Sequence, residues 1–167
     1  MAKARSRQSA VRFVLMKLGI NNPIYVLLLI LHVGIGLIGF GSNAIAGWTA
    51  RDVAANGSTD MVQRFFDGKI SLAQWCVVLV PVFGVSLLVV RDASDVEQPW
   101  FLVAVAIWII ELGILTARGW PAQRKLGTAL GSGGDAEIHR LGITVLRTQQ
   151  LVVILYLVAF YLMLFKP

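Results

Sequence analysis

The chain contains 167 residues, of which 57% are hydrophobic and 14% are charged. Because an average soluble domain has about 25% charged residues, this composition argues against an ordinary soluble protein. The formal net charge is +6, but no basic stripe alternates with stacking aromatic residues. The expected partner of this charge is therefore the anionic surface of a lipid bilayer and not a nucleic acid.

The first 22 residues form a basic segment. Its latter part, AVRFVLMKLGI, has the apolar and basic residues of a short amphipathic helix lying at a membrane surface. Asn21-Asn22-Pro23 ends this segment, since proline suits the first turn of a following helix. The basic residues of the segment are Lys3, Arg5, Arg7, Arg12 and Lys17.

Four apolar runs follow, and a helix needs about 20 such residues to cross a bilayer. They cover residues 23–48, 72–90, 100–117 and 146–165. The pattern predicts an all-α membrane protein whose single domain, 23–167, is an up-down-up-down bundle of four transmembrane helices. The linker over residues 118–147 is predicted to be the longest, with a mobile turn at Gly131–Asp135.

Flanking charge does not decide the orientation of this bundle. The side that carries both termini has seven Lys or Arg residues, and the other side has eight. Basic tails resist translocation, so the N-terminal segment favours a cytoplasmic N-terminus.

One face of the first span combines a histidine, two glycines and an asparagine. His32, Gly36, Gly39 and Asn43 follow one another at helical spacing along one side. Small residues let a neighbouring helix approach closely, so Gly36, Gly39 and Asn43 are predicted to form a helix-packing face. A cofactor groove is the alternative reading of the same face.

Two ionisable residues lie deep in the predicted spans, His32 in the first and Glu111 in the third. A charged group at the bilayer centre costs at least about 2.5–3.5 kcal/mol on insertion scales, so it is usually paired, neutral or functional. We expect either an intramembrane polar pair of His32 and Glu111, joined by a hydrogen bond, or a neutral Glu111, and in both cases the role is to fix helix packing. The alternative is a proton or substrate site.

The residues that would support enzymatic chemistry are missing from the pattern. The chain has no zinc-ligand spacing, phosphate-binding loop, nucleophile elbow or pair of catalytic carboxylates, and the single Cys76 excludes an internal disulfide. Haem ligated by two histidines would need a partner for His32 at similar depth, and His139 lies in a basic linker. We therefore expect no enzyme, no cofactor and no metal site.

Four segments resemble a family of bacterial integral membrane proteins with four spans and no assigned activity. The segments are LHVGIGLIGFG, LVPVFGVSLLV, QPWFLVAVAIWIIELGI and the terminal YLMLFKP. The resemblance implies a four-span fold and no particular activity. This chain departs from the family pattern in its long basic N-terminal segment, which such members are not expected to have.

These features lead to one main functional hypothesis and two alternatives. The main one is a non-enzymatic accessory subunit of a larger complex in the bacterial cytoplasmic (inner) membrane, for example a respiratory or other energy-transducing one, with other membrane subunits as partners. The first alternative is a small proton-coupled transporter that uses Glu111. The second is a haem-binding membrane protein that uses His32.

Overall fold

The chain folds into long helices. The computed structural model describes residues 22–57, 62, 65–66, 72–91, 94–132 and 134–165, and in these ranges all regular structure is helical. The predicted interfacial helix and basic tail of residues 1–21 lie outside the described residues. The main helices are α2 (Pro23–Asn56), α4 (Leu72–Arg91), α5 (Pro99–Ile114), α6 (Trp120–Ser132) and α7 (Asp135–Phe165), joined in places by the short turns η1 (Ser94–Glu97) and η2 (Leu115–Gly119).

Three helical stretches are long and apolar enough to cross a membrane. They are Pro23–Asn56, the continuous stretch Pro99–Ser132 formed by α5, η2 and α6, and Asp135–Phe165. The apolar part of α4, Gln74–Val90, is shorter. The prediction of an all-helical chain suited to a membrane is therefore confirmed, and the four predicted apolar runs fall in α2, α4, α5 and α7.

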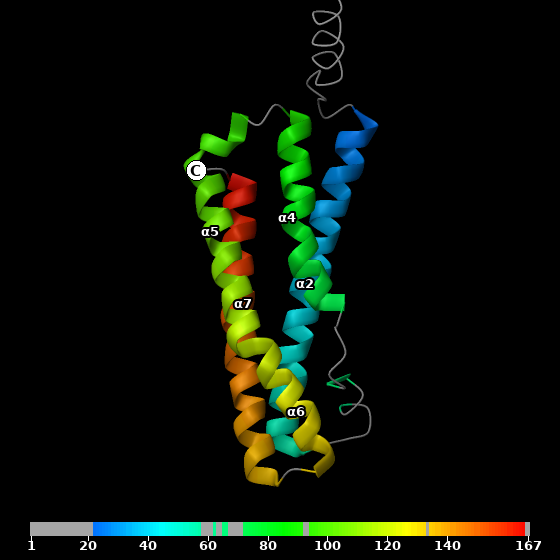
Figure 1. The fold of residues 1–167 in the computed structure, drawn as a ribbon, viewed down its shortest axis with the longest axis vertical. Helices are drawn as coiled ribbons and strands as arrows, with labels where there is room; N and C mark the ends of the chain where they lie inside the picture. Colours follow the sequence, from blue (N-terminus) through cyan, green and yellow to red (C-terminus); the bar gives the residue numbers. More distant parts are fainter. Residues whose placement is uncertain are drawn as a thin grey trace, which may run out of the picture.

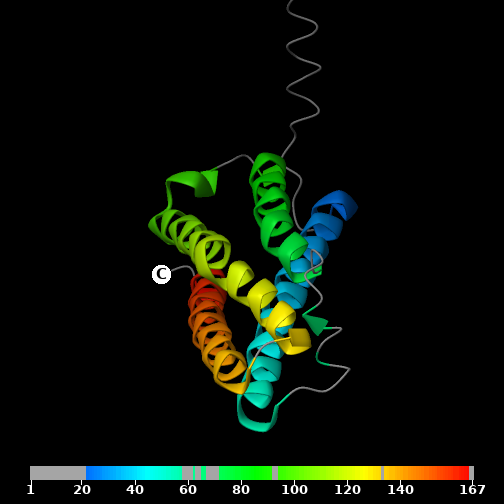
Figure 2. The same cartoon turned by 60° about the horizontal axis from the view of Figure 1, so that its bottom comes forward.

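The helices run alternately in opposite directions. Figure 1 shows α2 and α5 descending and α4 and α7 returning, so that the beginning of α2 and the end of α7 lie at the same end. α2 packs extensively on both α7 and α4, whereas α5 packs chiefly on α7. The view in Figure 2 shows α6 continuing obliquely from α5 toward the far end of α2.

The start of α2 follows directly from its sequence. Pro23 occupies the first turn, where the missing N–H of proline has no cost, and the side chain of Asn22 accepts a hydrogen bond from the N–H of Ile24 at 2.9 Å. At its other end α2 runs past the predicted boundary at Trp48 and continues to Asn56.

The prediction of a long linker over residues 118–147 is wrong. This segment contains a π-helical turn (η2), the whole of α6 and the start of α7, which leaves only a short connection after Ser132. The helical spacing of Ala122, Leu126 and Ala129 explains the difference, because it gives α6 one apolar face.

Two apolar clusters hold the helices together. The first, which we call the membrane core, includes Val77, Leu115, Val152 and Tyr156 from α4, η2 and α7. The second, the end core, joins the last turns of α2 to α6 and to the beginning of α7. Its members are Ala50, Val53, Phe66, Ala122, Leu126, Ala129, Leu130, Ile138, Leu141 and Val145.

Candidate functional site

The predicted packing face of α2 is turned toward its neighbours. A Cβ atom on Gly39 would lie 2.9 Å from the Tyr156 hydroxyl oxygen on α7 and 3.3 Å from the Cys76 Cβ on α4. The space beside Gly36 is bounded by Phe160 of α7 at 3.7 Å. Asn43 is 2% exposed, and its amide donates to the carbonyl of Gly39 at 2.8 Å. The three residues thus lie where α2 meets α7 and α4.

His32 is directed toward α4. Its Nδ1 lies 3.0 Å from the carbonyl oxygen of Val80, and a carbonyl can only accept, so Nδ1 donates this bond. The ring also fills the space beside Gly84, where an added Cβ would lie 3.1 Å from the histidine Cε1. His32 therefore links α2 to α4.

Glu111 lies in the interior of the bundle on α5. It is 3% exposed, and its Oε1 atom has no hydrogen-bond partner among the described residues. Its electrostatic neighbour is Tyr156 of α7, which also interacts with Cys76 of α4. The carboxyl group of Glu111 and the thiol of Cys76 therefore both lie within electrostatic range of the Tyr156 phenol.

The structure does not form the predicted polar pair of His32 and Glu111. His32 bonds to Val80, whereas Oε1 of Glu111 has no partner among the residues that the structure describes. The reason is the arrangement of the helices: α4 and α7 flank α2, while α5 packs chiefly on α7. His32 and Glu111 lie at similar positions along helices that run in the same direction. They stay apart because α2 and α5 are not packed extensively on each other.

A proline in α4 creates a polar contact that sequence reasoning missed. Pro81 has no N–H, so it cannot donate to the carbonyl of Val77 one turn earlier. The indole Nε1 of Trp108 on α5 donates to this carbonyl at 2.9 Å. Within a membrane such a carbonyl has no water to accept a hydrogen bond from, so the Trp108 indole supplies the donor that it lacks. Pro81 was the signal that could have revealed this contact, because it exposes a carbonyl at a known position.

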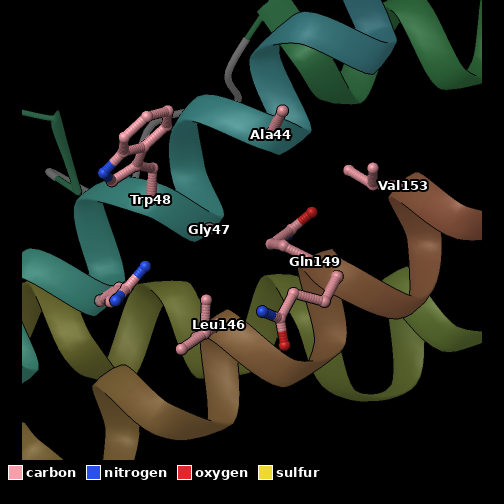
Figure 3. Close-up of a pocket in the computed structure, with 8 residues that line it drawn as sticks. Ala44, Gly47, Trp48, Leu146, Gln149 and Val153 are labelled. Atoms are coloured by element: carbon pink, nitrogen blue, oxygen red, sulfur yellow. The ribbon is translucent and has the colours of Figure 1, made fainter.

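A groove of about 210 Å³ lies between α2 and α7, and no sequence pattern indicated it. Figure 3 shows Gln149 at this place, beside Gly47 and between the two helices. Gln149 is 1% exposed, and neither of its side-chain polar atoms has a hydrogen-bond partner among the described residues. The groove is lined by Ala44, Gly47, Trp48, Arg51, Leu146, Gln149, Gln150 and Val153.

The histidines do not come together as a haem-ligand pair. His139 Nδ1 bonds to the carbonyl of Ala54, near the end of α2 that is remote from His32. The 22 residues from His32 to Ala54 correspond to about 33 Å along a helix. Among the described residues there is also no group of three His, Cys, Asp or Glu side chains that could hold a metal ion.

Comparisons of the chain with protein-family models, with curated proteins and with solved structures found no match. Membership of the four-span family that the apolar segments resemble therefore stays a prediction. What the structure itself provides is the helical architecture, the interior carboxyl group and the groove between α2 and α7.

Proposed function

We propose that this chain is a non-enzymatic membrane subunit that packs through one face of α2 against a helix of another subunit. The observation that carries the proposal is the empty space beside Gly34 and Gly41, where an added Cβ would meet nothing within 4 Å. On the same helix, Gly36, Gly39 and Gly47 are covered by side chains of α7.

The two uncovered glycines belong to one face. Gly34 and Gly41 are seven residues apart, so they lie on the same side of α2, and that side is opposite the buried one. The exposed side chains of Ile38 and Ile45 share it. We call these four residues the outer glycine face. A shallow notch between bulky side chains is the geometry that lets a second membrane helix approach closely.

In this proposal α2, α4, α5 and α7 cross the bilayer in alternating directions. The bacterial cytoplasmic membrane is proposed because the apolar segments resemble a bacterial family. An energy-transducing assembly is proposed as one example of a complex with such subunits, and no motif supports it. Exposed large apolar side chains along α2, α5 and α7 support a lipid or protein environment for these helices.

Replacing Gly41 by leucine should release the chain from its assembly, because the new side chain fills the notch. The measurement is the size of the native particle in mild detergent, and the parent chain is expected in a particle well above 18.2 kDa. The matched control is Gly113→Leu, since Gly113 on α5 also has nothing within 4 Å of an added Cβ. A monodisperse monomer or homodimer of the parent chain, with no co-purifying subunit, would refute the proposal.

A second candidate is a small proton-coupled transporter, and one observation favours it. Glu111 is a buried carboxyl group with an oxygen that has no partner among the described residues, next to Tyr156 in the membrane core. An intramembrane ionisable residue is by default a candidate for proton transfer. In the subunit proposal the same residue only fills space between α5 and α7.

The substitution Glu111→Gln separates the two candidates. The amide keeps the shape of the side chain, so we expect the free energy of unfolding to change by less than about 1 kcal/mol and the assembly to persist. The measurements are thermal unfolding in detergent and proton flux into proteoliposomes followed with a pH-sensitive dye. A folded variant that has lost a flux present in the parent would establish the transporter instead.

A further inference from the structure

The groove between α2 and α7 lies where the predicted apolar runs 23–48 and 146–165 meet charged segments of the same helices. Trp48, at 76% exposure, and the exposed Arg51 stand at its rim on α2. Tryptophan favours the headgroup level, and arginine extends its charge toward water. Ala44 on α2 and Val153 on α7 are the lining residues nearest to the middle of the two predicted spans. The groove therefore combines a basic and aromatic part on α2 with apolar residues of both predicted spans.

The buried amide of Gln149 is a second indication that this groove binds a ligand. Both polar atoms of its amide lie buried without a hydrogen-bond partner among the described residues, although a buried unsatisfied amide costs about 1–3 kcal/mol. Its Cβ lies close to Gly47, since a Cβ added there would be 2.9 Å away, so the side chain sits between the helices (Figure 3). A ligand in the groove can provide the hydrogen bonds that the amide lacks.

Charge indicates the chemistry of this ligand. Among the described residues that line the groove, Arg51 is the charged one, and none is a carboxylate. The described helices carry six basic and three acidic side chains at this end of the bundle. The basic ones are Arg51, Arg118, Arg124, Lys125, Arg140 and Arg147, and the acidic ones are Asp52, Asp135 and Glu137. An anion is therefore favoured over a cation or a neutral group.

We infer that this groove binds the headgroup of an anionic phospholipid. The Arg51 guanidinium pairs with the phosphodiester, and the Gln149 amide bonds to the oxygens of the glycerol and ester region. Ala44 and Val153 then line the first part of an acyl chain. This assignment does not depend on the assembly proposed above, because both residues and the groove belong to one chain.

The experiment measures lipid binding to the purified full-length protein by native mass spectrometry, with phosphatidylglycerol and phosphatidylcholine as probes. Arg51→Gln should weaken phosphatidylglycerol binding about tenfold or more, as expected for a lost hydrogen bond between charged groups. Gln149→Leu keeps the side-chain size and should weaken it about fivefold, the loss of one neutral hydrogen bond. Arg51 is exposed, so its variant tests the site even if Gln149→Leu does not fold.

The matched control is Arg140→Gln, which removes the same charge from the same end of the bundle at an exposed residue of α7 six positions before the first lining residue of that helix. Its phosphatidylglycerol binding should stay within about twofold of the parent, because a more remote surface charge contributes little. Equal losses for Arg51→Gln and Arg140→Gln would overturn the inference, and so would equal binding of the two lipids. Displacement of the lipid by inorganic phosphate alone would identify a phosphate site instead.

Discussion

Replacing Gly142 by leucine should force α2 and α7 apart in the end core. An added Cβ on Gly142 would lie 2.9 Å from the carbonyl oxygen of Ala50 and 3.0 Å from the Cβ of Ala54. Both neighbours belong to α2, and a backbone carbonyl cannot turn aside as a flexible side chain can. Overpacking of this kind costs about 1–3 kcal/mol and sometimes more. We expect Gly142→Leu to lower the free energy of unfolding more than Glu111→Gln does.

The expected loss of stability can be measured with a probe placed in the end core itself. In a chain carrying Ala129→Cys and Cys76→Ser, the new thiol is buried and becomes reactive toward a maleimide only when α6 detaches. The urea concentration at which it reacts should fall clearly on adding Gly142→Leu. The control is Gly131→Leu, because Gly131 on α6 has nothing within 4 Å of an added Cβ. Equal midpoints for the two glycine substitutions would show that the contact with Ala50 does not limit packing.

Replacing Trp108 by phenylalanine should destabilise the contact between α4 and α5. The ring volume is partly kept, but the carbonyl of Val77 loses its donor and cannot gain one from Pro81. A buried carbonyl left without a partner costs about 1–3 kcal/mol. The measurement is the midpoint of unfolding in a detergent titration, with Trp75→Phe at an exposed position of α4 as the control.

The second half of this test restores the missing donor. Pro81→Ala returns an N–H to position 81, which can donate to Val77 in the ordinary helical pattern. In a chain that carries Pro81→Ala, Trp108→Phe should therefore lower the free energy of unfolding clearly less than it does in the parent chain. The difference between the two losses is the coupling free energy of positions 81 and 108, expected at about 0.5–3 kcal/mol. Additive effects of Pro81→Ala and Trp108→Phe would show that the indole contributes by packing alone.

Much of the helical architecture could be predicted from the sequence, because the apolar runs are long and charges are excluded from them. The ends of the helices could not be predicted in this way. The segment of residues 51–56 carries charges and has the composition of a linker, yet Val53 within it is buried in the end core. α6 contains Gly127 and Gly131, both poor helix formers, and its apolar face is stabilised by packing on α7. Tertiary contacts decide such segments, and periodicity alone underestimates them.

The candidate sites were harder to predict for a different reason. Glu111 and His32 stand out as ionisable residues in apolar runs, but the sequence does not state which helices are neighbours, and in the structure His32 bonds to Val80 of α4. Gln149 carried no signal, since it lies in the polar run Arg147-Thr148-Gln149-Gln150 at the edge of an apolar span. Its burial depends on Gly47 of a helix about a hundred residues away in the sequence, which no local pattern reveals.

In the membrane arrangement proposed above, the two cores of this chain are surrounded by different solvents, and this affects the order in which they unfold. In that arrangement the end core, which lies among segments rich in charged residues, is in water, so it is stabilised by the hydrophobic effect, which urea weakens. In the same arrangement the membrane core lies among lipid tails, where helices associate by close packing and hydrogen bonds without that driving force. A denaturant dissolved in water therefore acts on α6 before it acts on α4. We therefore expect unfolding in two steps with separate free energies, with the helices still in the bilayer after the first.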